Sequence, residues 1–229
     1  MEFVCGVGSG LDRPTNHSER CSSHAIPARP TTTEPKRMKS FPPEAFAPLN
    51  GKLTQLIYEN PDRGVAPRLE FALEIPFEPF ELDDEEEEVT TALWISGIRP
   101  EVKSFRELAG QALGTSALTG SEGSVRLFHA MNPVELSELR FGAVGDGTVE
   151  VELQADIDFE LDGDEEYGIV TISLKAPLEI HGLRIATSID KRLNGDPDAI
   201  CSEIGSLVDL SAYGAPERVP GGLVLPPLD

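Results

Sequence analysis

The segment 148–161 constrains the fold of this chain more than any other part of its sequence. Over its fourteen residues, TVEVELQADIDFEL, polar and apolar side chains alternate at every position. A period of two predicts an extended strand with one buried and one solvated face, whereas a helix would scatter the same apolar residues around its axis. The polar face is mostly a row of carboxylates, so it restricts what this face of the strand could bind.

Segments with a strand-like pattern are spread over the chain. We predict strands at 52–58, 69–77, 89–98, 125–131, 134–143, 148–161 and 168–180. Gly145-Asp146-Gly147 predicts a tight hairpin turn, and Asn132-Pro133 predicts a second turn. The alternation slips at Ser137-Glu138, which predicts a β-bulge. Segment 89–98 contains Trp94, the single tryptophan, and is apolar on both sides, so we expect a central strand.

Two short helices are predicted beside these strands. In 104–113, Ser104 and Glu107 have the spacing of a capping box. In 196–210, Asp196 is placed to cap the helix and Pro197 suits its first turn. The last residues, VPGGLVLPPLD, are expected to form a tail or a strap against the body of the protein.

Consecutive strands with short connections favour antiparallel pairing, and strands and helices do not alternate as a parallel sheet requires. We therefore predict a mainly β (α+β) fold. Its core would be an antiparallel sandwich or strongly curved sheet of about seven strands, with one or two short helices. A barrel-like closure is the alternative.

Charge divides the chain near Met38. The whole chain has a net charge of -21, yet residues 1–37 carry +1, so residues 38–229 carry -22. Residues 1–37 are rich in Ser, Thr, Pro and Gly and have no apolar period, which predicts a disordered tail. We also consider that Met38 is the true start and that 1–37 is upstream sequence. Residues 38–229 are interpreted as one antiparallel β domain with a C-terminal helix and tail.

The composition restricts the partners and the compartment. A strongly negative protein repels nucleic acid and anionic lipid and attracts cationic proteins. Three cysteines form neither a disulfide framework nor a CxxC metal motif, so we expect a reducing compartment, the cytoplasm. No apolar run approaches the roughly 18 residues that span a membrane.

Catalytic and metal motifs have little support in this sequence. Carboxylates from Asp156 to Asp164 resemble part of a calcium loop, but Ile169 stands where the bidentate Glu would be required. A weak calcium site within 158–166 stays open. His129 and His181 lie in no zinc motif, and Cys201 has the setting of an inert buried thiol. We assign no catalytic, cofactor or metal residue, and the oligomeric state stays undetermined.

Three functions are compatible with these observations. The first is a non-catalytic acidic binding protein that recognises a cationic protein, for example an immunity- or antitoxin-like inhibitor. The second is a small-molecule-binding or enzymatic β domain with an internal cavity lined by Trp94, Phe128 or His129. The third is a structural or assembly module with an exposed β edge. For the first, the predicted partner-binding residues are Glu81, Asp83, Asp84, Glu85, Glu86, Glu87, Glu88, Asp162, Asp164, Glu165 and Glu166.

The two acidic segments, 81–88 and 162–166, each follow a predicted strand. If every strand runs antiparallel to the one before it, the second and sixth strands point the same way. Both acidic segments should then leave the same end of the domain, which would focus negative charge there.

Overall fold

The computed structural model describes residues 39–42, 45–82, 88–127, 130–160, 167–220 and 222–228. All of them belong to one compact unit of the chain, Lys36–Asp229. The expectations for residues 1–37 therefore lie outside the described residues.

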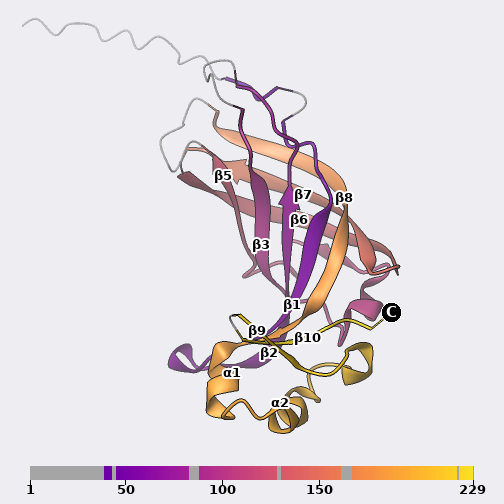
Figure 1. The fold of residues 1–229 in the computed structure, drawn as a ribbon. Coiled ribbons are helices and arrows are strands. Elements are labelled where there is room, and N and C mark those ends of the chain that lie inside the picture. The colour runs from indigo at the N-terminus through magenta and orange to yellow at the C-terminus, as the bar shows by residue number, and fades with distance from the viewer. Residues whose placement is uncertain are drawn as a thin grey trace, which may run out of the picture. The chain divides into compact units, whose positions relative to one another are not determined.

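The described residues form ten strands, two α-helices and three short 3-10 helices (Figure 1). The strands are β1 (Gly51–Asn60), β2 (Val65–Pro76), β3 (Ala92–Ile98), β4 (Ala112–Gly114), β5 (Glu122–Leu127), β6 (Ala130–Gly145), β7 (Thr148–Asp158), β8 (Ile169–Ile185), β9 (Glu217–Val219) and β10 (Gly222–Leu225). The helices are α1 (Thr187–Arg192), α2 (Pro197–Ile204), η1 (Pro61–Arg63), η2 (Phe105–Leu108) and η3 (Leu210–Ala212).

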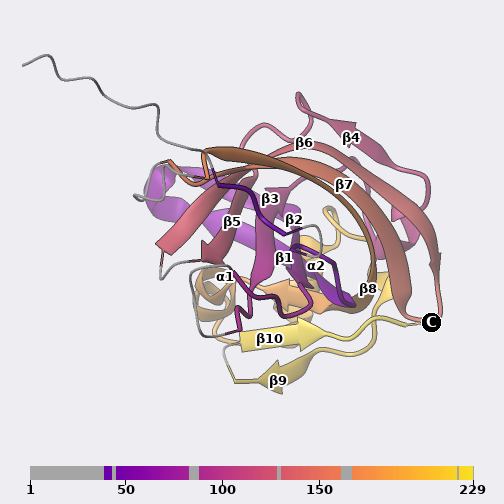
Figure 2. The same cartoon turned by 90° about the horizontal axis from the view of Figure 1, so that it is seen from above.

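Seven strands form a closed ring of hydrogen-bonded neighbours in the order β1-β2-β3-β5-β6-β7-β8 (Figure 2). Each step along this order is antiparallel, and β1 then pairs with β8 in parallel. Six antiparallel steps leave the first and last strands pointing the same way, so their contact has to be parallel. The predicted mainly antiparallel, strongly curved β fold is confirmed, and each predicted strand overlaps one of these seven.

The core lies inside this ring and follows the alternation of the sequence. In β7, Val149, Val151 and Leu153 are buried, whereas Glu150 and Glu152 are exposed. The buried residues face the apolar side chains of β8, with Leu153 directly opposite Leu174. The row of carboxylates on β7 is therefore an outer surface, as its period of two predicts.

Two local predictions on β6 and β7 are confirmed. Gly145 pairs with Thr148, and the two residues between them, Asp146 and Gly147, have φ values of 50° and 69°. Positive φ at both central residues is the signature of a type I′ hairpin turn, which matches the twist of the flanking strands. The register with β7 shifts between Leu136 and Glu138, so the expected bulge lies at Ser137.

The helix predicted at 104–113 is wrong. Only the single turn η2 forms, and the Ser104 side chain makes no capping hydrogen bond. The Glu107 carboxylate instead accepts a hydrogen bond from the backbone N–H of Lys103, 3.2 Å away. Gly110, at φ 77°, redirects the chain into β4, where Leu113 pairs with Leu139 of β6. The apolar residues reach the core from a turn and a strand, so they need no helical face.

The turn predicted at Asn132-Pro133 is also wrong, because both residues lie inside β6. Asn132 pairs with Val125 and Pro133 with Ser124, and the chain reverses between Leu127 and Ala130. Asn132 is fully buried, and its side-chain amide donates to the carbonyl oxygens of Val125 and Leu127 at 3.3 and 3.4 Å. An asparagine can satisfy backbone groups in a sheet as well as in a turn, so the dipeptide signal was ambiguous.

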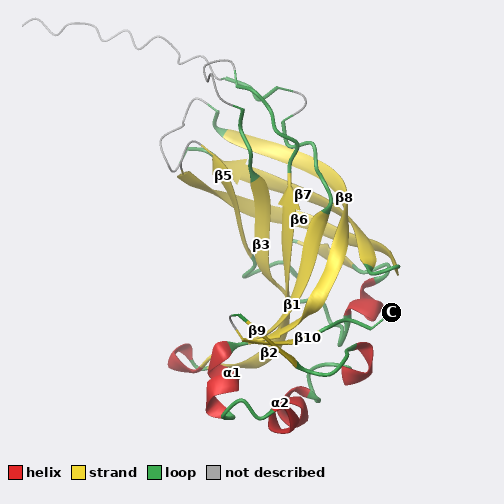
Figure 3. Ribbon diagram, in the orientation of Figure 1, coloured by secondary structure: helices red, strands yellow, loops and turns green. Residues whose placement is uncertain are grey.

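The helices gather at one end of the ring, and loops occupy the opposite end (Figure 3). The Asp196 side chain accepts hydrogen bonds from the N–H groups of Asp198 and Ala199, so the predicted cap of α2 is confirmed, although the helix ends at Ile204. The C-terminal segment is a strap, because β10 pairs with the end of β8. Helix α1 was not predicted.

Candidate functional site

The residues that flank the two acidic segments are described, although most of the acidic residues are not. Phe80 and Val89 exchange two backbone hydrogen bonds, which closes the loop that contains segment 81–88. The N–H of Phe159 donates to the carbonyl of Gly168 at 3.1 Å and closes the second loop. Glu81 and Glu88 are exposed. The other predicted partner-binding residues lie outside the described residues: Asp83, Asp84, Glu85, Glu86, Glu87, Asp162, Asp164, Glu165 and Glu166.

A cluster of aromatic rings joins the bases of both loops. The Phe41 ring lies 6.4 Å from Phe80, 5.0 Å from Phe159 and 4.6 Å from Tyr167, measured between ring centroids. Phe80 precedes the first acidic segment, whereas Phe159 and Tyr167 flank the second. The residues that flank the two segments therefore lie together, because β2 and β7 run in the same direction around the ring.

The outer carboxylates of β7 divide into two groups. Towards the β6–β7 hairpin, the Lys175 ammonium lies 3.2 Å from the carboxylates of both Glu150 and Glu152. On β6, Arg140 pairs with Glu138. Hydrogen bonds to Glu150 and then to Glu152 raise the pKa of Lys175. The negative charge of this half is thus partly neutralised.

The other half of β7 carries carboxylates without a cationic partner. Asp156 lies directly opposite Glu135 of β6, and Asp158 and Glu160 follow towards the loop. Within the described ranges, none of these four carboxylates forms an ion pair. One basic residue, Lys39, also stands nearby, over the Tyr167 ring at 5.8 Å. We call the surface formed by Glu81, Glu88, Glu135, Asp156, Asp158 and Glu160 the acidic end.

Apolar side chains are exposed beside these carboxylates. Ile169, directly opposite Asp158, is 61% exposed, and Met131 at the start of β6 is 52% exposed. Exposed apolar residues that stand singly are common on protein surfaces, so these two residues add apolar area to this face without marking a binding site by themselves.

Metal ligands are not assembled in the part of the chain that is described. No group of three or more His, Cys, Asp or Glu side chains there could hold a metal ion. Asp162 and Asp164, which belong to the weak calcium site considered from the sequence, lie outside the described residues.

Trp94 does not line an internal cavity. Leu93 and Ile95 point into the ring, whereas Trp94 points outwards and is 38% exposed. The interior around β1 and β2 is filled by apolar side chains and by Gln55, whose side-chain oxygen accepts a hydrogen bond from the Tyr213 hydroxyl. Burial raises the pKa of Tyr213, which keeps that hydroxyl protonated. Phe128 and His129 lie outside the described residues.

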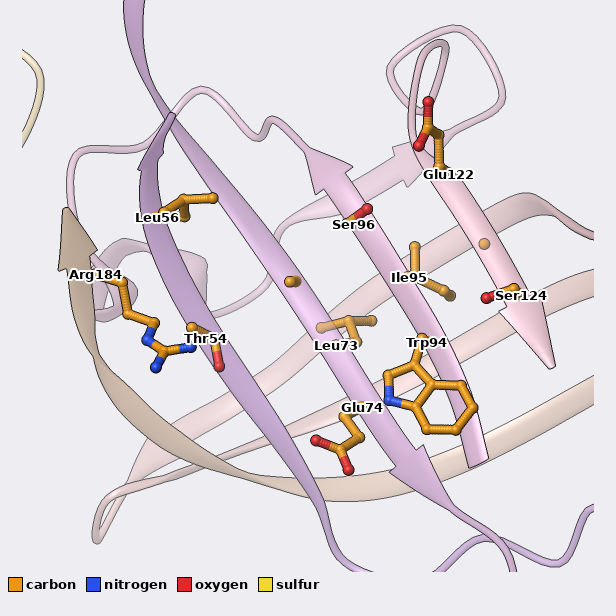
Figure 4. A pocket seen from close by; sticks show the side chains of 12 residues that line it. Thr54, Leu56, Leu73, Glu74, Trp94, Ile95, Ser96, Glu122, Ser124 and Arg184 are labelled. Carbon is orange, nitrogen blue, oxygen red and sulfur yellow. The ribbon is translucent and has the colours of Figure 1, made fainter. Parts of the chain in front are cut away.

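The outer face of the sheet is hollowed next to Trp94 (Figure 4). This outer groove has a volume of about 520 Å³ and crosses β1, β2, β3 and β5. Its outward-facing lining residues are Thr54, Leu56, Ala72, Glu74, Trp94, Ser96, Glu122, Ser124 and Arg184. Most of the side chains around Trp94 are small, which leaves the indole standing beside open space.

A bulge in β3 shapes the groove. Phe71 pairs with Ile98 and Leu73 with Ile95, so Ser96 and Gly97 together oppose one residue of β2. Gly97 has a φ of 74°, and a Cβ there would lie 3.0 Å from the carbonyl oxygen of Gly120, so a side chain is disfavoured. A bulge of this kind bends its strand and increases the local twist. The outer face is therefore curved where Trp94 projects.

Carboxylates stand on both sides of Trp94. Glu74 of β2 and Ser124 of β5 are its direct neighbours in the ladder, and Glu122 lies opposite Ser96, two residues further along β3. Glu74 forms an exposed ion pair with Lys52 at 3.5 Å. Arg184 of β8 occupies the opposite side of the groove, beyond Thr54 (Figure 4). Glu74 is thus the carboxylate beside the indole, whereas Glu122 lies at the other end of the groove (Figure 4).

Among the described residues, no strand pairs with one edge of the first half of β8. Its residues from Ile169 onward pair with β7, but β1 pairs with β8 only from Leu178. Before β1 the chain follows β2 instead, with the N–H of Leu49 donating to Pro76 at 2.8 Å. A second groove, of about 710 Å³, lies between segment 39–48 and this edge.

Two other reactive side chains, Cys201 and His181, lie among the described residues. Burial, followed by the nearby Asp198 carboxylate, raises the pKa of the Cys201 thiol, which opposes formation of a nucleophilic thiolate. His181 lies at the β8 surface, 3.9 Å from Glu179. Sequence reasoning missed Glu74 and Glu122 as neighbours of Trp94. The sequence did contain a signal that Trp94 faces outwards. Ser96, a polar residue two positions later in the same strand, should face the same side of the sheet as Trp94.

The chain matches no known protein family, and no characterised protein or solved structure shows significant similarity to it. In the described parts of the chain, no helix has both the length and the apolar character to cross a membrane.

Proposed function

We propose that this protein is a non-catalytic binding protein whose acidic end docks a cationic partner protein. The observation that carries the proposal is the aromatic cluster around Phe41, which gathers the bases of both acidic segments at one end. An inhibitor that covers the basic cleft of a nucleic-acid-cleaving toxin is one concrete form of such a protein.

The distribution of charge supports this choice of surface. Carboxylates near the β6–β7 hairpin have Lys175 and Arg140 as partners, whereas Asp156, Asp158 and Glu160 have no ion pair in the described structure. Unpaired carboxylates on one surface produce a field that accelerates encounter with a positive surface. The exposed Ile169 and Met131 add apolar area that a docked partner would bury.

The closed ring also supports a docking surface that is formed before the partner binds. The ring closes through hydrogen bonds, and Phe80 and Phe159, which begin the two loops, are buried. Flanking residues that are held in place before the partner arrives lower the ordering cost of association.

Affinity capture from a lysate of the source cells tests the proposal. The bait proteins are the natural chain, an end-neutral variant (Glu81→Gln, Glu88→Gln, Glu160→Gln) and a matched variant (Asp62→Asn, Glu101→Gln, Glu217→Gln). All six residues are exposed, and both variants remove three negative charges. We expect the natural chain and the matched variant to retain the same basic protein at low salt and release it at high salt. Equal retention by the end-neutral variant would contradict the acidic end as the docking surface.

The unpaired edge of β8 favours a second candidate, a structural or assembly module. An exposed strand edge can accept a strand from another chain through backbone hydrogen bonds. Sedimentation of the purified protein at about 0.15 M salt, near physiological ionic strength, tests this candidate. A concentration-dependent oligomer that Ser173→Pro disperses would support it, and a monomer at all concentrations would contradict self-assembly.

A further inference from the structure

We propose that the outer groove is a binding site for an arginine side chain of the cationic partner, with the guanidinium stacked on Trp94 beside Glu74. The origin of this arginine depends on the proposed function, but the chemistry of the groove can be tested without any partner.

The indole ring of Trp94 is available for stacking. In the described structure, basic side chains already lie near the rings of Tyr58, Phe105 and Tyr167, at 5.5 to 5.8 Å from the ring centroids. Trp94 has neither a cation nor another aromatic ring against it among the residues that the structure describes. Tryptophan is the aromatic side chain that attracts cations most strongly, so its free face is an unused recognition element.

The carboxylates beside the indole determine the sign of the ligand. Glu74 is the direct cross-strand neighbour of Trp94, with Cβ atoms about 5 Å apart in such pairs, and Glu122 is a diagonal neighbour at about 7–8 Å. The indole extends towards Glu74 and away from Glu122 (Figure 4), so a cation over the ring would lie beside Glu74, and Glu122 would add negative charge at the other end of the groove. The planar guanidinium of arginine fits this arrangement because it can stack on the ring and still donate hydrogen bonds from its edge to a carboxylate.

The remaining walls fit the stem of an arginine side chain. Leu56 and Ala72 contribute apolar surface, whereas Ser96 and Ser124 are small enough to leave room beside the indole. The bulge at Ser96 and Gly97 bends β3 at this point, and bulges often occur next to functional sites. Apolar walls with a few placed polar groups are the usual composition of a ligand site.

The groove is also within reach of a partner docked at the acidic end. Trp94 lies five residues after Val89, which closes the first acidic loop, so the two are separated by roughly 16 Å of extended chain. A partner that covers Glu88 could therefore extend a side chain or a short segment along the outer face of β3.

Intrinsic fluorescence tests the site directly, because Trp94 is the single tryptophan of the chain. The probe is N-acetyl-arginine amide, and the control is N-acetyl-citrulline amide, which has nearly the same shape without the charge. We expect a saturable change in tryptophan emission with the arginine probe, with a Kd on the order of 1–10 mM. An equal response to the citrulline probe, or no response to either, would overturn the proposal.

Variants separate the groove from general charge effects. Glu74→Gln with Glu122→Gln should weaken binding of the arginine probe about fivefold or more, whereas Glu101→Gln with Glu217→Gln removes the same charge elsewhere and should change it little. Lys52→Gln removes a competitor for Glu74 and should tighten binding. Ser124→Arg places a guanidinium opposite Trp94 and should abolish the response. Equal binding by the two double variants would overturn the role of the carboxylates.

The outcomes distinguish this inference from the proposed function. If the arginine probe fails while the end-neutral variant still loses its partner, the groove is not the site but the acidic end stands. If the probe binds as expected while the end-neutral variant retains its partner, the groove binds guanidinium and the docking surface has been assigned wrongly.

Discussion

The rings of Phe41 and Phe159 lie 5.0 Å apart, at an interplanar angle of 37°. This contact connects the segment before β1 to the residue that follows β7. Because Phe41 also contacts Phe80, one ring links the bases of two acidic segments that are far apart in the sequence. The proposed docking surface depends on this aromatic cluster, so the contribution of the cluster to stability is the first property to measure.

Phe159→Ala should lower the free energy of unfolding by about 3–5 kcal/mol, because the ring is fully buried and the surrounding sheet cannot collapse into the space. Glu152→Ala on the outer face of β7 is the control and should change it by less than about 0.5 kcal/mol. Urea denaturation of both variants measures the difference. Similar losses at the two positions would mean that the outer face of β7 is not solvated.

Arg192→Met should lower the stability of the protein. The Arg192 guanidinium donates to Glu59 at 3.1 Å, and the Glu59 side chain is only 4% exposed, so the variant leaves a buried carboxylate without a cation. Adding Glu59→Gln removes that charge and should restore part of the loss. Thermal or urea unfolding of the single and double variants checks this, and a double variant less stable than the single one would refute the explanation.

Acid unfolding should depend on the pair Asp190–Arg218. Two hydrogen bonds from the Arg218 guanidinium, 2.8 and 2.9 Å long, hold the pKa of Asp190 below its ordinary value. Because the pKa of Asp190 is lower in the folded protein than in the unfolded chain, the pair stabilises the fold at pH values above the ordinary carboxyl pKa. That stabilisation is lost as the pH falls through the folded pKa.

Arg218→Gln should therefore raise the titration midpoint of Asp190 and reduce the loss of stability in acid. Carboxyl-resolved NMR titration measures the first effect, and unfolding at acidic and neutral pH measures the second. Arg63→Gln removes an exposed guanidinium that takes no part in the Asp190–Arg218 hydrogen bonds and is the control. An Asp190 midpoint that is the same in the natural chain and in Arg218→Gln would contradict the assignment.

Deleting residues 1–37 should leave the melting temperature unchanged within error. These residues have too few periodic apolar side chains to offset the entropy cost of ordering them. Calorimetry of the full and shortened chains provides the comparison. A drop of several degrees would show that the segment contributes to the domain.

Local pattern predicted the seven ring strands because most of them carry their own alternation and segment 89–98 is a short apolar run. It predicted the bulge at Ser137 because an extra residue breaks the alternation visibly. The closure of the ring was not predictable in this way. β1 and β8 are more than a hundred residues apart in sequence, and no local pattern specifies their parallel pairing. The errors at Ser104 and Asn132 arose because short capping and turn signals are compatible with several backbone conformations.

The candidate site was predictable only in part. That the residues flanking the two acidic segments lie at one end follows from strand parity, which antiparallel pairing determines. The outer groove could not be predicted from strand parity. It depends on a bulge at Gly97 and on which side chains are neighbours of Trp94 across three strands. Neighbours such as Glu74 are defined by register, and register becomes visible only when the strands are paired.

The association rate of a captured basic partner with the end-neutral and matched variants tests the central claim most directly. Stopped-flow measurements at about 20 mM and about 300 mM salt, on either side of physiological ionic strength, separate steering from contact. We expect the end-neutral variant to associate about 3- to 10-fold more slowly than the matched variant at low salt, with the difference largely lost at high salt. Equal rates for the two variants at low salt would contradict docking at the acidic end.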